Sequence, residues 1–266
     1  MSRAYYCTVE ELNERGRDNI PDQFRSNMHL IYSSPATLAF NSPGAEGFGV
    51  KRAGLAVPDS IMLIVAPGCC GRNTSLISSM REYDNRFFYL MMDETDIVTG
   101  RHLKKIPKAV KEICDCCEKK PSVVMICITC VDALLGTDME RVCRKAEEKV
   151  DIPVRPCYMY ALTREGRKPP MVHVRQSLYS LLEPQKKKGN VVNLLGFFSP
   201  LVDDCEMYEL LQQAGVKTIH EISRCKDYEE YQTMSQANFN LVLHPEARFA
   251  AEDFHCLLYT SPSPRD

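Results

Sequence analysis

The sequence predicts an α/β protein made of repeated doubly wound parallel sheets (Rossmann-like domains) with flanking helices. Two observations lead to this fold class. Short apolar segments typical of buried strands recur between residues 61 and 244. Between them lie segments whose apolar residues recur at helical spacing. Strands that alternate with helices in this way run parallel and are covered by the helices that connect them.

The predicted elements form two groups separated by a basic, turn-prone segment, QKKKGN (185–190). In the first group, strands are predicted at 61–66, 86–91, 122–129 and 152–159, and helices at 71–81, 101–120 and 130–150. In the second group, strands are predicted at 191–198, 216–222 and 239–244, and helices at 205–215, 226–237 and 245–254. Gly215 suits the residue that follows a helix end.

These groups divide the chain of 266 residues into five regions. We predict an N-terminal helix and loop segment (1–58), a first Rossmann-like domain (59–165), a connecting helix and linker (166–189), a second, truncated Rossmann-like domain (190–256) and a tail (257–266). The tail, which ends in YTSPSPRD, does not continue the preceding pattern. We interpret it as non-native translated adapter sequence; a natural disordered tail is the alternative.

Composition narrows the range of partners. The formal net charge of -2 gives no reason to expect nucleic acid or an anionic membrane surface. No apolar run reaches the roughly 18–20 residues of a membrane helix, and the polar N-terminus has no signal core. We therefore expect a cytoplasmic protein. Its thirteen cysteines are then free thiols or metal ligands, and an odd number cannot pair completely.

Three of these cysteines follow predicted strands. Cys69 and Cys70, in VAPGCCGR (65–72), come after the first strand, and Cys130 comes after the third. Ligands of open parallel sheets gather at the carboxyl ends of strands, where helix N-termini favour thiolates and tolerate an anionic iron–sulfur cluster. A cysteine at a strand end is often only a small buried hydrophobic residue. Two such sites at one sheet edge favour ligation by Cys130 and by one of Cys69 and Cys70, because neighbouring residues of an extended turn point apart.

Two cysteines do not complete a four-thiolate cluster site, but two subunits that meet face to face could each donate two. The other candidates carry weaker signals. Cys114, Cys116 and Cys117 lack a second ligand pair for zinc, and Cys127 is interpreted as a core residue. The carboxylates Asp93, Glu94, Asp96, Asp132 and Asp138 are interpreted mainly as helix caps, although a metal-binding or proton-relay role stays open. His173, His220 and His244 have no partner at ligand spacing.

Three motifs, in order and at similar spacing, resemble those of a known family: PGCCG (67–71), DIVTG (96–100) and ITCVDALLGTDM (128–139). From Asn41 to Phe254 the chain resembles component 1 of nitrogenase and nitrogenase-like reductases. The resemblance implies a subunit of three doubly wound domains that pairs with a like subunit, as a homo- or heterodimer or a tetramer. It also implies an iron–sulfur cluster at their interface and electrons from a separate ATP-dependent iron–sulfur reductase. Cys69 and Cys130 fall on two of the family's interfacial ligands.

The chain also departs from the family pattern. No cysteine lies near Pro43, where nitrogenase has its first cluster ligand, and Pro245 stands where the cofactor cysteine is expected. Arg101 replaces the second glycine of the Asp-Ile-Val loop. These differences argue against an eight-iron cluster and against dinitrogen reduction. A 4Fe–4S cluster with two cysteines from each subunit fits better.

We therefore predict a cluster-bearing component 1 subunit of a nitrogenase-like two-component reductase. Its substrate is unknown and its catalytic residues cannot be named from this sequence. One alternative is a scaffold on which a metal cofactor is assembled, as some family members are. A second alternative is a structural subunit whose buried thiols hold no metal.

Overall fold

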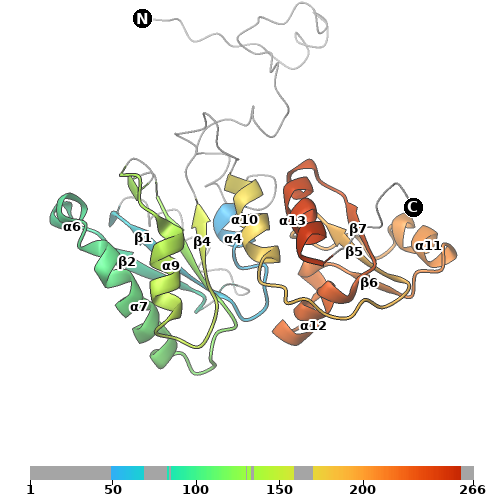
Figure 1. The fold of residues 1–266 in the computed structure, drawn as a ribbon, viewed down its shortest axis with the longest axis horizontal. Helices are drawn as coiled ribbons and strands as arrows, with labels where there is room; N and C mark the ends of the chain where they lie inside the picture. Colours follow the sequence, from blue (N-terminus) through green and yellow to red (C-terminus); the bar gives the residue numbers. More distant parts are fainter. Residues whose placement is uncertain are drawn as a thin grey trace, which may run out of the picture. The chain divides into compact units, whose positions relative to one another are not determined.

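The computed structural model describes residues 49–68, 83, 85–129, 131–132, 135–158 and 170–258. All of them belong to one compact unit, Ala36–Asp266. They form two parallel sheets flanked by helices (Figure 1), which confirms the predicted α/β fold class. The first sheet has the strand order β2-β1-β3-β4 and the second has the order β6-β5-β7. The domain boundaries proposed from the sequence stay predictions.

The first sheet follows the predicted strands closely. Its strands are β1 (Ile61–Ala66), β2 (Phe87–Met91), β3 (Val124–Ile128) and β4 (Val154–Tyr158). The accompanying helices are α4 (Val50–Ala53), α6 (Glu94–Thr99), α7 (His102–Cys116), α9 (Met139–Glu147) and α10 (Pro170–Tyr179). The helix predicted at 71–81 lies outside the described residues.

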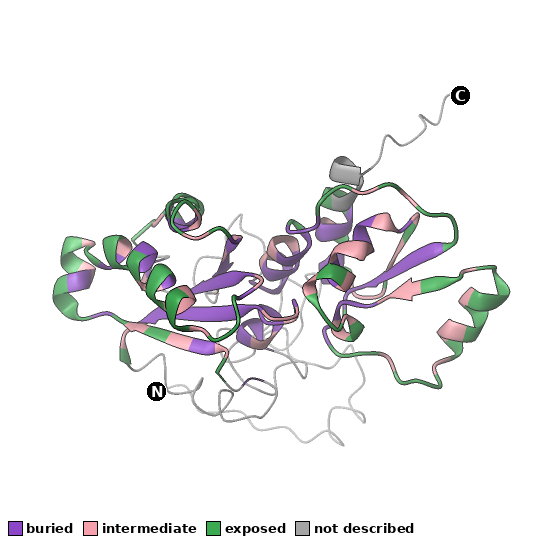
Figure 2. Ribbon diagram, turned by 90° about the horizontal axis from the view of Figure 1, so that it is seen from below, coloured by how far each residue is buried: buried purple, intermediate pink, exposed green. Residues whose placement is uncertain are grey.

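The two central strands of this sheet, β1 and β3, are buried along their whole length, as their colour in Figure 2 shows. Met62 and Ile64 of β1 pack in the same hydrophobic cluster as residues of α4 and α10. Leu63 and Val65, which point to the opposite face, pack in a second cluster with residues of α7 and α9. A strand with helices on both sides reads as a continuous apolar run, which is why IMLIVA shows no alternation.

The helix predicted at 130–150 differs from the observed one. The helix α9 begins only at Met139, where the side chain of Asp138 accepts a hydrogen bond from the backbone N–H of Arg141. Gly136 adopts a left-handed conformation with φ of 63° two residues before this cap. The left-handed Gly136 interrupts the helical backbone, and the cap at Asp138 starts α9. The apolar periodicity of this part of the sequence gives no sign of the interruption.

The second sheet consists of β5 (Val191–Leu195), β6 (Thr218–His220) and β7 (Phe239–Val242). Its helices are α11 (Glu206–Gln213), α12 (Tyr228–Thr233) and α13 (Arg248–Leu258), with single 3-10 turns η5 (Ile222–Arg224), η6 (Met234–Gln236) and η7 (Pro245–Ala247). The central strand β5 is fully buried. Gly215 has φ of 88° just after α11, as predicted for a helix end.

The strand β5 stops at Leu195 rather than at residue 198, because Gly196 has φ of 139°. A Cβ at this position would lie 2.7 Å from the backbone nitrogen of His244. Two separate reasons therefore require glycine at position 196: its backbone conformation and the close approach of the segment after β7.

Within the described ranges, no helix combines the length and the apolar character that crossing a membrane requires.

The substitution Gly196→Ala is expected to lower the free energy of unfolding by about 2 kcal/mol or more, because it adds backbone strain and a steric clash. Gly189→Ala is the matched control, since nothing lies within 4 Å of a Cβ at Gly189. It should change stability by no more than about 0.5 kcal/mol. Urea unfolding followed by circular dichroism measures both. Equal stability of the two variants would contradict the role assigned to Gly196.

Candidate functional site

The carboxyl ends of β1 and β3 lie next to each other in the first sheet. The two strands pair in parallel, with Val65 opposite Ile128. The chain therefore leaves both strands at the same edge, toward Cys69 and Cys70 after β1 and Cys130 after β3. All three cysteines lie outside the described residues. The two segments that carry the cysteines therefore start from neighbouring strand ends, and the approach of the cysteines to one another stays a prediction.

The residue before the cysteine pair, Gly68, has a close neighbour on β2. A Cβ on Gly68 would lie 3.0 Å from the terminal methyl carbon of Met91, the last residue of β2. Met91 itself is 57% exposed. The ends of β1 and β2 thus lie close together, and the side chain of Met91 is open to solvent next to Gly68.

A buried histidine connects this edge to the segment after β3. His102, the first residue of α7, is 1% exposed, and Asp132 is fully buried. The Nδ1 atom of His102 donates to the backbone carbonyl oxygen of Asp96 at 3.0 Å, because a carbonyl oxygen can only accept. Its Nε2 atom lies 2.9 Å from Oδ1 of Asp132. That hydrogen bond needs one proton on either of the two atoms.

Two buried oxygen atoms near Cys130 have no hydrogen-bond partner. They are Oγ1 of Thr129, directly before Cys130, and Oδ2 of Asp132, two residues after it. The other carboxylate oxygen of Asp132 also accepts from the hydroxyl of Thr137 at 3.0 Å. Native structures rarely leave buried polar atoms unpaired, and such atoms often mark the place of a group that is not represented.

The Asp-Ile-Val motif forms a capped, charged corner beside the histidine. Asp93 caps α6, because its side chain accepts from the backbone N–H of Asp96, as the sequence predicted for this acidic group. Lys105 donates to the buried carboxylate of Asp96 at 2.6 Å, and Arg101 lies 3.6 Å from its other oxygen. The hydrogen bond from Lys105 holds the pKa of the Asp96 carboxyl below its usual value, although burial opposes the shift.

The other cysteines of the described chain do not join the predicted site. Cys127 is fully buried on the α4 and α10 face of β3, which confirms its interpretation as a core residue. It pairs across the strands with Cys157, whose pKa is raised by their hydrogen bond and by burial. Burial also raises the pKa of Cys114 and Cys117. Among the described residues no three potential ligands gather closely enough to hold a metal ion.

The residues at the edge of the first sheet fit an iron–sulfur cluster. The segments that carry the cysteines leave the neighbouring ends of β1 and β3, and the unpaired hydroxyl of Thr129 can donate to a thiolate or to a cluster sulfide. The carboxylate of Asp132 is held by His102 and by the hydroxyl of Thr137.

The carboxyl edge of the second sheet carries a different set of groups. Pro245, at the position where nitrogenase is expected to have its cofactor cysteine, is exposed and begins η7. The next residue, Glu246, is 2% exposed and forms an ion pair with Arg175 of α10 at 2.7 Å. Arg175 also donates to the carbonyl oxygen of Gly196 and lies over the ring of Phe198. These are interactions that hold α10 to the sheet rather than ligands for a metal.

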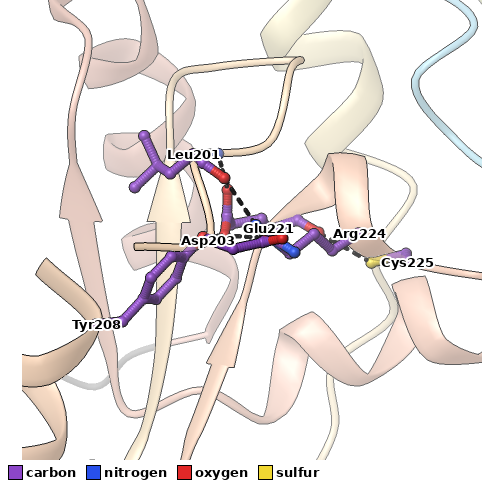
Figure 3. A network of polar contacts seen from close by, with 6 residues as sticks. All are labelled: Leu201, Asp203, Tyr208, Glu221, Arg224 and Cys225. Atoms are coloured by element: carbon purple, nitrogen blue, oxygen red, sulfur yellow. Dashed lines mark hydrogen bonds and ion pairs between the residues drawn. The ribbon is translucent and has the colours of Figure 1, made fainter. Parts of the chain in front are cut away.

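A second polar network surrounds Glu221, directly after β6 (Figure 3). Its buried carboxylate accepts from the backbone N–H of Leu201, from the hydroxyl of Tyr208 and from Nε of Arg224. Burial and the hydrogen bond to Glu221 raise the pKa of Tyr208. The thiol of Cys225 donates to the carbonyl oxygen of Glu221, so this cysteine also serves local packing. The network borders an open pocket of about 360 Å³. The polar groups in its lining, Tyr208, Glu221 and Arg224, are already hydrogen-bonded to one another.

Sequence reasoning missed the three residues with the most informative contacts, His102, Arg175 and Glu246. None of them stands at ligand spacing from a partner, since His102 and Asp132 are 30 positions apart and Arg175 and Glu246 are 71 apart. The available signal for His102 was its place directly after the Asp-Ile-Val loop, at the start of a helix. That signal becomes specific only when β2 and β3 are known to end at the same edge.

Parallel strands covered by helices define the chain as a doubly wound α/β protein, a class that binds its ligands at the carboxyl ends of the strands. The model of the nitrogenase component 1 type oxidoreductases matches residues 46–255. The chain belongs to this family. The resemblance found in its motifs is thereby confirmed.

Several curated relatives are named nitrogenase iron-molybdenum cofactor biosynthesis protein NifE. The protein of Nostoc sp. strain PCC 7120 is 24% identical over 241 residues, which cover 88% of this chain and 50% of the relative. The Rhizobium meliloti protein is 29% identical over 70% of this chain and 40% of the relative. The Klebsiella pneumoniae protein is 26% identical over 76% and 48%. The chain thus spans half or less of the length of these relatives.

Solved structures also match. Nitrogenase Cp1 at pH 6.5 aligns with a TM-score of 0.59 and 20% identity over 87% of this chain and 45% of that chain. Nitrogenase Cp1 at pH 5 aligns with a TM-score of 0.58 and 19% identity. At this identity the likeness shows the fold.

The substitution Lys105→Met is expected to raise the pH at which the protein unfolds in acid. The lowered pKa of Asp96 stabilises the folded state above about pH 4, and this contribution is lost as the pH falls through the folded-state value. Without Lys105 that value rises, so the loss begins at higher pH. Acid titration in a fixed urea concentration, followed by fluorescence or circular dichroism, measures the shift. Lys108→Met, an exposed lysine of the same helix, is the control and should leave the midpoint unchanged.

Proposed function

We propose that this chain is an iron–sulfur cluster-bearing subunit that serves as a scaffold in the assembly of a nitrogenase-type metal cofactor. The observation that carries the proposal is the pairing of β1 with β3, whose neighbouring ends lead to Cys69 and Cys130 in the sequence, in a chain whose curated relatives are named for cofactor biosynthesis. Cys69 and Cys130 are the proposed ligands of a 4Fe–4S cluster, and Cys70 is the reserve ligand. A like subunit supplies the other two thiolates.

The main interpretation of the sequence predicts a reductase subunit that receives electrons from an ATP-dependent partner. The relatives favour the scaffold, which the sequence analysis held as its alternative. The second sheet agrees with this preference, because Pro245 replaces the expected cofactor cysteine and the adjacent Glu246 is committed to Arg175. A catalytic cofactor held there by a thiolate is therefore not part of the proposal.

The cluster is tested by anaerobic purification of the full chain, followed by quantification of iron and acid-labile sulfide in the dimeric fraction. We expect about two irons per chain, since one 4Fe–4S cluster is shared by two subunits. The double substitution Cys69→Ala, Cys130→Ala should abolish iron binding. Cys116→Ala, Cys205→Ala, which removes two thiols elsewhere on the chain, is the matched control and should retain it.

Absence of iron from a folded dimer, even after reconstitution with ferrous iron and sulfide, would contradict the cluster proposal. It would favour the third reading, a structural subunit with packed thiols. Iron retained in the Cys69, Cys130 double variant would instead place the cluster elsewhere on the chain.

The scaffold role is tested separately from the cluster. The iron-loaded dimer is incubated with an apo-ferredoxin under anaerobic conditions, and holo-ferredoxin formation is followed by absorbance. A scaffold should transfer iron–sulfur units to the acceptor within minutes to hours. A cluster that stays bound, but is reduced rapidly by an ATP-dependent iron–sulfur reductase, would favour the electron-transfer reading.

A further inference from the structure

We propose that His102 is a positioning residue that fixes Asp132, two residues after the proposed ligand Cys130, and that cluster binding depends on this contact. This inference rests on the proposed function, because it assumes that Cys130 is a ligand. It goes beyond that function by assigning a role to a residue that lies outside the cysteine motifs. His102 acts through Asp132 and makes no contact with the cluster.

The two nitrogen atoms of His102 join two separate segments of the chain. Nδ1 contacts the carbonyl oxygen of Asp96 in α6, which follows β2, and Nε2 contacts Asp132, two residues after Cys130. Because α6 and the segment after β3 leave the same edge of the sheet, the imidazole ties one strand end to the other across the site. Both side chains are almost fully buried, so water does not compete for these hydrogen bonds.

The segment after Cys130 is closed by its own hydrogen bonds. The backbone N–H of Thr137 donates to the carbonyl oxygen of Asp132, and that of Leu135 donates to Val131, both at 3.0 Å. The hydroxyl of Thr137 adds a bond to the Asp132 carboxylate. These bonds tie Leu135 and Thr137 to Val131 and Asp132, and the bond from Asp132 to His102 fixes Asp132 against α7. Because Asp132 follows Cys130 by only two residues, its position limits where Cys130 can lie.

Two substitutions at position 102 separate this role from general stability. In His102→Gln the amide nitrogen takes the place of Nε2 and can still donate to Asp132. In His102→Asn it takes the place of Nδ1 and can donate only to Asp96. Each variant keeps one of the two hydrogen bonds, so similar losses of thermal stability are expected. His220→Gln, at the edge of the second sheet, is the control for loss of an imidazole.

Iron per chain and the EPR spectrum of the dithionite-reduced dimer are measured for all four proteins. His102→Gln and His220→Gln should retain the wild-type iron content and g values. His102→Asn should lose at least half of the iron, and the remaining signal should be shifted or broadened. Equal iron and identical spectra in the Gln and Asn variants would overturn the positioning role, while a wild-type protein without iron would overturn the proposed function instead.

If both His102 variants fail to yield a folded dimer, the partner residue provides the test. Asp132→Asn keeps a hydrogen-bonding group of the same size opposite Nε2, whereas Asp132→Ala removes it. The Asn variant should retain iron and the Ala variant should lose at least half. Equal iron content in these two variants would overturn the inference.

Discussion

The parallel pairing of β1 with β3 is the constraint on which the candidate site depends. Both strands are buried on both faces, between the α4 and α10 side and the α7 and α9 side. Their register is therefore fixed, because a slip of one residue would exchange the two sets of side chains. Since the register is fixed, the strand ends are fixed as well, and with them the starting points of the turns that carry Cys69 and Cys130.

Much of this arrangement could be read from the sequence, and some could not. Continuous apolar runs such as IMLIVA and SVVMICIT predicted the strands, because burial on both faces leaves a strong local signal. The helix predicted from residue 130 to 150 was right for Met139–Glu147, but it was wrong to run through residues 135–138, because the cap at Asp138 and the conformation of Gly136 set a new start that the apolar pattern does not show. The cysteine motifs indicated the carboxyl edge of the first sheet as the candidate site. The cysteines themselves lie outside the described residues, and their ligation stays a prediction.

The contacts of His102 show why the remainder of the site needed a structure. A histidine and an aspartate 30 positions apart carry no joint pattern in one sequence. They meet because β2 and β3 flank β1 and end at the same edge. The departures from the family pattern, in contrast, were visible in the sequence, and the structure adds their contacts. Arg101, which replaces a glycine of the family, lies near Asp96. Glu246, next to Pro245, forms an ion pair with Arg175.

The buried pair of Arg175 and Glu246 has a consequence for how this chain can change over time. Loss of either partner alone strands the other charge in the interior, which typically costs about 3–5 kcal/mol, a large part of the stability of an ordinary domain. Positions 175 and 246 are therefore expected to vary together among homologues rather than one at a time. Only a paired change of both residues would open this edge of the second sheet to another ligand. The cost of the single substitutions therefore keeps homologues with and without the ion pair apart.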